Sequence, residues 1–219
     1  MKFTFLGTGT SQGVPVITCT CEVCQSADRK DNRTRTSLMI QSETTTVVID
    51  TGPDFRAQML RENVKDLDAV VFTHGHKDHV AGLDDIRPFN YLLGKTIDVY
   101  AEERVQQILK REFSYAFEPQ DYLGAPQINL KTIDEMPFMI GDIPFTPIRV
   151  FHKELPVLGF RVGDFTYITD SNFIAEEELE KIKGSKILVL NALRRETHYS
   201  HFNLEQAIEI VNIIKPEQA

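Results

Sequence analysis

Thr73-His74-Gly75-His76-Lys77-Asp78-His79 is the most informative stretch of this 219-residue sequence. It places four potential metal ligands within six residues, at the end of a strand predicted over 69–73. A strand end followed by a glycine-containing turn can direct such side chains toward one point. The first two histidines can then bind one divalent ion, while Asp78 and His79 face a second. Neutral imidazole and carboxylate suit borderline ions such as Zn²⁺, Mn²⁺ or Fe²⁺.

Strands and helices alternate along the rest of the chain, with hairpins in each half. Hydrophobic patterning predicts strands at 2–6, 37–41, 45–49, 69–73, 97–101 and 186–190, and helices at 53–62, 102–117 and 175–183. Gly141-Asp142 and Gly163-Asp164 lie between alternating apolar runs and predict hairpin turns. These hairpins exclude a purely parallel, doubly wound sheet. The order favours an α/β (α+β) fold, an αββα sandwich of two mixed sheets with outer helices.

The last helix has a predicted start and stop. Asn203 can cap it, with Gln206 three residues on, and Pro216 ends it. Helical spacing predicts a buried face made of Leu204, Ala207, Ile208, Val211 and Ile214. No repeat, low-complexity tract or linker interrupts the sequence, so we expect a single domain over 1–219.

The composition is that of a globular protein with an acidic surface. Hydrophobic residues make up 42%, and 24 Lys plus Arg stand against 32 Asp plus Glu, a net charge of −8. This balance argues against a broad nucleic-acid or anionic-membrane footprint. No apolar stretch approaches the roughly 20 residues that span a bilayer, and the N-terminus turns polar too soon for a signal peptide. We therefore expect a cytoplasmic protein without a membrane partner.

The three cysteines lie within six residues, at Cys19, Cys21 and Cys24. An odd, clustered trio in a reducing compartment predicts metal ligands or redox chemistry instead of a disulfide framework. Thiols two and three residues apart in a loop converge readily on one Zn²⁺.

The pattern His-x-His-x-Asp-His after a buried strand resembles the signature of the metallo-β-lactamase superfamily of hydrolases. Further positions match in chain order. Asp50, in Val-Ile-Asp-Thr-Gly, resembles the aspartate that supports the ligands from behind. His152 resembles the third imidazole of the first metal, and Asp170, in Tyr-Ile-Thr-Asp-Ser, resembles the carboxylate that bridges both metals. The resemblance implies a site of two divalent ions, Zn or Mn, with ligands His74, His76, Asp78, His79, His152 and Asp170.

A finer resemblance points to one branch of this superfamily. Leu6-Gly7-Thr8-Gly9-Thr10-Ser11, followed by the cysteine trio, resembles the PhnP-like cyclic-phosphate phosphodiesterases. The resemblance implies a structural zinc held by Cys19, Cys21 and Cys24, with a histidine near the C-terminus as fourth ligand. His201, just before the last predicted helix, resembles the catalytic histidine of the branch, and Asp78 is the other residue expected to act in catalysis. His198 has no counterpart with an assigned role.

The sequence departs from the family pattern at its end. The pattern places one more histidine after a further strand, as the last protein ligand of the second metal. No remaining histidine fills that place before Ala219. The resemblance therefore implies that the domain lacks its C-terminal strand and last histidine motif.

The resemblance implies a phosphodiesterase that hydrolyses a small cyclic or nucleotide phosphodiester with water activated by two metal ions. His201 would serve as a proton donor. Three alternatives stay open: a transfer-RNA 3′-processing endonuclease, a thioester or lactone hydrolase, and a metal-binding sensor without turnover. The expected partner is a small-molecule phosphodiester instead of a nucleic acid. A homodimer is left open, and the natural substrate and metal are not predicted.

Overall fold

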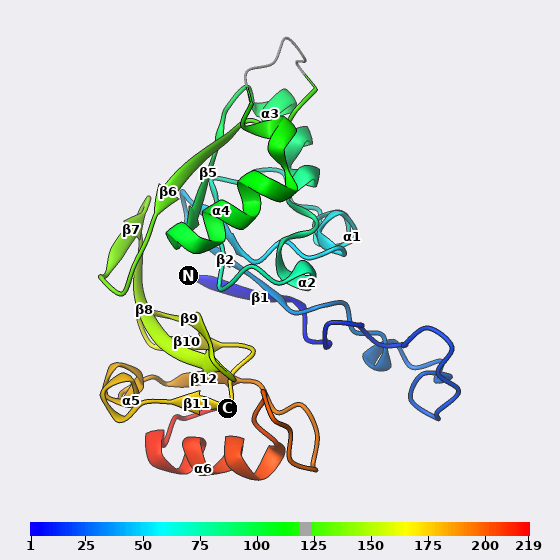
Figure 1. Cartoon of the computed structure of the whole chain (residues 1–219), viewed down its shortest axis with the longest axis vertical. Helices are drawn as coiled ribbons and strands as arrows, with labels where there is room; N and C mark the ends of the chain where they lie inside the picture. The colour runs from blue at the N-terminus through cyan, green and yellow to red at the C-terminus, as the bar shows by residue number, and fades with distance from the viewer. Residues whose placement is uncertain (119–123) are drawn as a thin grey trace. The chain divides into compact units, whose positions relative to one another are not determined.

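The computed structural model describes residues 1–118 and 124–219. Backbone packing divides the chain into two compact units, Met1–Thr132 and Ile133–Ala219. Each unit contains one mixed β-sheet together with its own helices (Figure 1). The single domain over 1–219 stays a prediction.

The first unit is built on a six-stranded sheet in the sequential order β1-β2-β3-β4-β5-β6. Its first two pairings are antiparallel and the remaining three are parallel. The strands are β1 (Lys2–Gly7), β2 (Ser37–Gln41), β3 (Thr46–Ile49), β4 (Ala69–Val71), β5 (Ile97–Ala101) and β6 (Ile128–Thr132). Between β1 and β2, a long loop extends away from the sheet (Figure 1). This loop contains the three cysteines and one short 3-10 turn, η1 (Arg29–Asp31).

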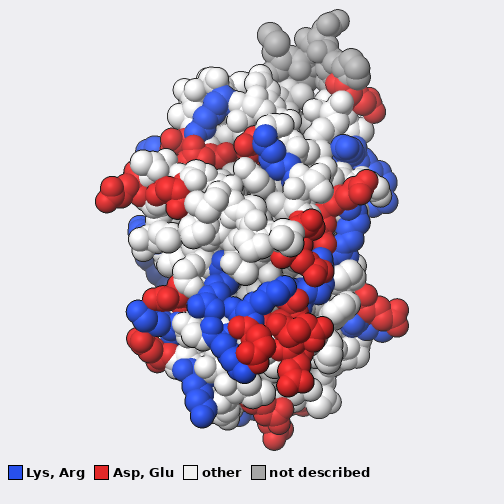
Figure 2. Space-filling model, turned by 90° about the vertical axis from the view of Figure 1, so that its left-hand side faces the viewer, with Lys and Arg blue, Asp and Glu red and all other residues white. Residues whose placement is uncertain are grey.

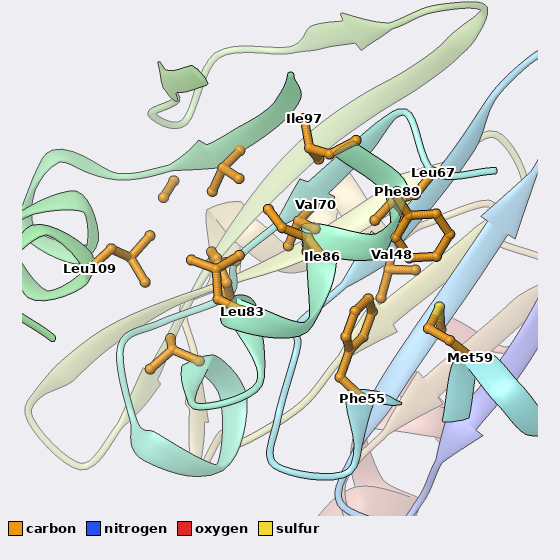
Figure 3. Packing of buried hydrophobic residues seen from close by; sticks show 14 of the residues in the cluster. Val48, Phe55, Met59, Leu67, Val70, Leu83, Ile86, Phe89, Ile97 and Leu109 are labelled. Atoms are coloured by element: carbon orange, nitrogen blue, oxygen red, sulfur yellow. The ribbon is translucent and has the colours of Figure 1, made fainter. Parts of the chain in front are cut away.

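Short helices follow the parallel strands of the first unit. They are α1 (Phe55–Arg61), α2 (Lys77–Val80), η2 (Leu83–Ile86), α3 (Arg87–Leu93), α4 (Glu103–Glu112) and η3 (Ser114–Ala116). Their apolar faces pack on the sheet around Val48 and Val70, both fully buried (Figure 3). Phe55 and Met59 of α1 and Phe89 of α3 close the same core. Burial of these side chains, at about 25 cal/mol per Å², is what holds such short helices in place.

The second unit has a sheet in the order β11-β8-β9-β10-β12, with β7 paired to β8 outside that path. Only the β10–β12 pairing is parallel. Its elements are β7 (Phe138–Ile140), β8 (Ile143–His152), β9 (Leu155–Val162), β10 (Phe165–Ile168), β11 (Phe173–Ile174), α5 (Glu176–Ile182), β12 (Ile187–Leu190) and α6 (Leu204–Ile214). Beyond α6, Gln218 forms a parallel bridge with Ile187.

Both predicted hairpins are confirmed. Ile140 pairs with Ile143, and Val162 pairs with Phe165, so each turn has two residues. The first turn residues, Gly141 and Gly163, have φ angles of 55° and 59°. This left-handed conformation is what a two-residue hairpin favours and what glycine adopts without strain.

The prediction for α6 is confirmed in its ends and partly wrong in its buried face. Asn203 and Gln206 form a reciprocal capping box at its start. Ala207 and Ile214 are buried, but Leu204 and Ile208 are 37% and 48% exposed. Successive helical residues are turned by about 100°, so Ile208 falls outside a stripe centred on Ala207.

One predicted helix ends a full turn before its expected end. The helix expected over 102–117 ends at Glu112, where Phe113 leaves the helical region with ψ of 40° and η3 follows. The fold class is nevertheless confirmed, because two mixed sheets with helices make up the α+β arrangement expected from the sequence.

Candidate metal centre

The histidine-rich stretch connects β4 to α2 in the first unit. β4 is fully buried, and burial continues through Thr73 and His74, which are both 0% exposed. The chain then turns, and the N–H groups of His79 and Val80 donate to the His76 carbonyl to begin α2. His79 is also 0% exposed. Two of the predicted ligands are thus buried polar groups that need fixed partners.

Asp50, which follows β3, supplies those partners. Its Oδ1 accepts from the backbone N–H of Thr73 at 2.9 Å, and its Oδ2 accepts from the Thr73 hydroxyl at 2.8 Å. The same Oδ2 lies 2.7 Å from Nδ1 of His79. Burial raises the pKa of the Asp50 carboxyl, while His79 and Thr73 act in the opposite direction. The carboxylate is held at a buried position by three donors.

These contacts fix the tautomers of two imidazoles. Since the Thr73 hydroxyl gives its proton to Asp50, it accepts from Nδ1–H of His74, 3.0 Å away. His79 likewise donates from Nδ1 to Asp50. In both neutral rings the lone pair is therefore on Nε2, the nitrogen that binds a metal. Such support from behind a ligand is the usual way in which proteins orient metal-binding histidines.

The distances fit divalent ions. Nε2 of His74 lies 3.1 Å from Nδ1 of His76. Two nitrogens bound tetrahedrally to one zinc at about 2.0–2.1 Å are roughly 3.3 Å apart. This approach of two ring nitrogens is favourable if Nδ1 of His76 carries a proton that it donates to Nε2 of His74, or if one cation binds both nitrogens. Oδ2 of Asp78 lies 3.3 Å from Nε2 of His79, a pairing of carboxylate and imidazole that suits a second ion.

Two glycines hold α2 against the loop that follows Asp50. A Cβ on Gly52 would lie 2.1 Å from the Asp78 carbonyl oxygen, and one on Gly82 would lie 2.1 Å from the Gly52 carbonyl oxygen. The N–H of Gly82 also donates to the Thr51 carbonyl at 2.8 Å. Backbone therefore packs directly on backbone at this crossing, which places Asp78 and His79 close to Asp50.

The other predicted site residues gather in the second unit. His152, at the end of β8, donates from Nδ1 to the Ser200 carbonyl at 2.7 Å, which leaves its lone pair on Nε2. Its ring lies 4.5 Å from that of His201, centroid to centroid. Nδ1 of His201 is 3.5 Å from Oδ1 of Asp170. The structure therefore brings these three residues together within this unit.

His198, whose role the sequence left open, belongs to the same group. Its ring centroid is 5.2 Å from that of His201, and its Nδ1 lies 3.4 Å from the Ser200 N–H. Sequence reasoning missed Ser200, which contacts two histidines through backbone atoms. A carbonyl or N–H has no sequence signature, so only the spacing His198-x-x-His201 could have suggested this loop.

The cysteines form a separate cluster on the long loop between β1 and β2. The Sγ atoms of Cys19, Cys21 and Cys24 all lie within 4.8 Å of one another. The backbone N–H of Cys24, followed by the Cys19 thiol, lowers the pKa of Cys21. The Val16 N–H acts to lower the pKa of Cys24, yet burial and the two neighbouring thiols raise it overall. Three adjacent sulfur donors fit a zinc ion, which relieves the repulsion between thiolates.

Among the described residues, no helix is long and apolar enough to cross a membrane. On the face shown in Figure 2, Lys and Arg side chains lie next to Asp and Glu, and no broad area has one sign of charge.

The comparisons with known proteins agree with this geometry. The model of the beta-lactamase superfamily domain matches residues 45–219. An octanoyltransferase of Porphyromonas gingivalis is 42% identical over 217 residues, which are 98% of this chain but 44% of that protein. Coenzyme PQQ synthesis protein B of Methylobacterium radiotolerans is 32% identical over 101 residues, 40% of this chain and 34% of that protein. The chain thus spans less than half the length of these curated relatives.

Among solved structures, a diphosphatase from the PhnP family is 39% identical, with a TM-score of 0.90 over 98% of this chain and 83% of that one. Zn²⁺-bound PqqB from Methylobacterium extorquens, 21% identical, has a TM-score of 0.75 over 90% of this chain and 74% of that one. The latter shows a shared fold alone. With the family match over most of its length and this structural likeness, the chain belongs to the metallo-β-lactamase superfamily, in its PhnP-like branch.

Proposed function

We propose that this chain is a metal-dependent phosphodiesterase that hydrolyses a small cyclic or nucleotide phosphodiester. The observation that carries the proposal is the pair of ring nitrogens on His74 and His76, 3.1 Å apart and supported from behind by Thr73 and Asp50. The 39% identity to a PhnP-family diphosphatase supports phosphorus–oxygen bonds as the target.

In this proposal the two sets of site residues act together. His74, His76 and His152 hold one divalent ion, Asp78 and His79 hold a second, and Asp170 is shared. Zinc or manganese bound there supplies Lewis acidity for the attacking water and for the phosphate oxygens. Cys19, Cys21 and Cys24 hold a structural zinc.

The chain's own residues have three further roles in the proposal. Asp50 keeps the proton of His79 on Nδ1, so that Nε2 stays available as a ligand. The Ser200 carbonyl does the same for His152. His201, whose Nδ1 lies 3.5 Å from Oδ1 of Asp170, donates a proton to the leaving oxygen.

A small substrate is favoured over a transfer-RNA precursor. The net charge is −8, and the face in Figure 2 mixes both signs. Nucleic-acid binding surfaces instead concentrate Lys and Arg, because most of the binding energy comes from phosphate contacts.

The test compares two neighbouring histidines. With Mn²⁺ or Zn²⁺ and bis-p-nitrophenyl phosphate, we expect His201→Ala to lower kcat by roughly 10²–10⁴ while metal content stays near wild type. His198→Ala, the matched control, should change kcat less than about tenfold, because no proton transfer is assigned to it. Wild-type turnover with an unaffected His201→Ala variant would remove His201 from the mechanism. A metal-loaded wild type without turnover would favour the sensor alternative.

One observation favours a second candidate, a thioester hydrolase. The relative from Porphyromonas gingivalis is named for octanoyl transfer, which is acyl chemistry. The same metal ligands could serve an acyl substrate. Assaying an octanoyl thioester beside the phosphodiester distinguishes the two, since the preferred substrate should show a kcat/KM at least about 100-fold higher.

A further inference from the structure

Asn191, which directly follows β12 in the second unit, forms hydrogen bonds with both backbone polar groups of Ser171. Its Oδ1 accepts from the Ser171 N–H at 2.9 Å, and its Nδ2 donates to the Ser171 carbonyl at 3.0 Å. Ser171 is 0% exposed. The amide side chain thus pairs with Ser171 as a neighbouring strand would, and neither bond depends on charge.

Ser171 follows Asp170, whose backbone is in a disfavoured conformation. Asp170 has φ of 49°, in the left-handed region that residues with a side chain seldom adopt. The Ser171 N–H belongs to the peptide that joins these two residues. Its orientation therefore depends on the backbone angles of Asp170, and the bond to Asn191 opposes relaxation of the backbone at that residue. Without it, the backbone from which the Asp170 carboxylate projects would be less constrained.

The same Ser171 carbonyl also fixes the loop that contains His201. It accepts from the N–H of Phe202 at 2.7 Å, in addition to Nδ2 of Asn191. Phe202 is the residue after His201 and is buried. One carbonyl oxygen therefore joins the segment of Asp170 to the segment of His201, and Asn191 sets where that oxygen lies.

We propose that Asn191 is a positioning residue that aligns the Asp170 carboxylate with the His201 imidazole. The inference deepens the proposed function and rests on it for the roles of these two groups. It assigns to Asn191 no contact with substrate or metal. The chemistry requires an amide here, because both an acceptor and a donor are used at once.

The test changes one atom of the side chain. Asn191→Asp keeps the shape and the acceptor but loses the donor to the Ser171 carbonyl and places a negative charge against it. Asn212→Asp, on the exposed side of α6, is the matched control for the same chemical change. Mn²⁺ is the probe, because imidazole and carboxylate bind it and the cysteine cluster does not compete well for it.

We expect Asn191→Asp to weaken Mn²⁺ binding by the metal-free chain by about 10–100-fold, the usual effect of losing support behind a ligand. Its kcat should fall by a similar factor with KM within about threefold of wild type. The Phe202 amide, which donates to the Ser171 carbonyl that the new charge repels, should exchange hydrogen faster. The amides of β10 should exchange as in wild type. Asn212→Asp should match wild type in all of these.

Unchanged Mn²⁺ affinity and unchanged exchange of the Phe202 amide would overturn the proposal. Equally faster exchange across β10 would also overturn it, because that would indicate general destabilisation. If Asn191→Asp does not fold, Asn191→Ser is judged by the same criteria. Weakened Mn²⁺ binding beside a wild type that cleaves no phosphodiester would uphold the positioning role and refute the proposed function, so the two failures are distinguishable.

Discussion

Replacing Asp50 tests the buried network that supports His79 and, through Thr73, His74, two of the histidines proposed to bind metal. Asp50→Ala removes the acceptor of three donors: the N–H of Thr73, its hydroxyl and Nδ1 of His79. Each buried donor left without a partner costs about 1–3 kcal/mol, so the sum is roughly 3–9 kcal/mol. Burial raises the pKa of Asp50, which means that burying its charge opposes folding and that its removal offsets part of this loss. We expect a net destabilisation of about 3–5 kcal/mol, in the range found for broken buried charge networks.

The assay is thermal unfolding of the metal-free chain, followed by metal titration. At about 2–4 °C per kcal/mol for a protein of this size, Tm should fall by roughly 6–20 °C. Asp50→Asn keeps the shape of the side chain and one acceptor oxygen, so it should lose less stability than Asp50→Ala. Both variants should bind metal about 10–100-fold more weakly, because the Asp50 carboxylate no longer holds the proton of His79 on Nδ1.

The control is Asp66→Asn, in an exposed ion pair with Lys95. It should cost less than about 1 kcal/mol, since exposed pairs contribute little. A Tm for Asp50→Ala within about 2 °C of wild type, together with unchanged metal affinity, would refute the reasoning, because no relaxation of the loop can satisfy three buried donors at once.

Two further predictions concern other parts of the first unit. Cys21→Ser should lower the Tm and the zinc content while leaving the catalytic-site metals bound, because a structural metal contributes directly to folding; elemental analysis with an unchanged zinc stoichiometry would contradict it. Burial, followed by the hydrogen bond to Asp84, raises the pKa of Tyr115 to about 12. Since the pKa of a tyrosine in the unfolded chain is about 10, this interaction stabilises the fold fully below pH 10 and is lost as pH rises toward 12. Urea unfolding should therefore show a stability gap between wild type and Tyr115→Phe that is constant from pH 7 to 9 and narrows by pH 11; a gap that widens would be contrary to this.

The sequence predicts well what depends on local periodicity and on side chains that bind metals. The strands around 37–49 and 97–101, the two hairpins and the cap at Asn203 follow from patterns of a few residues. The grouping of His74, His76, Asp78 and His79 follows from their spacing after β4. Such signals are complete within one stretch of chain.

What the sequence could not predict depends on atoms that every residue has, or on contacts between distant segments. The carbonyl of Ser200 orients His152 across 48 positions, and Asn191 reaches back 20 positions to Ser171. Asparagine after a strand is usually a turn residue, so its amide gives no sign of such a partner. The exposed Ile208 on α6 has the same origin, because the neighbours available at its angle on the helix are set by tertiary packing.

The crossing of Gly52 and Gly82 has a consequence for how this protein can vary. Neither glycine has a side chain that reaches a ligand, yet a single methyl group at either would overlap a carbonyl oxygen of the opposite loop. In a library of all single substitutions, both positions should therefore be as intolerant as the histidines, and for a purely steric reason. New activities selected on this scaffold would have to arise from other loops, since this crossing leaves no room in which to add an atom.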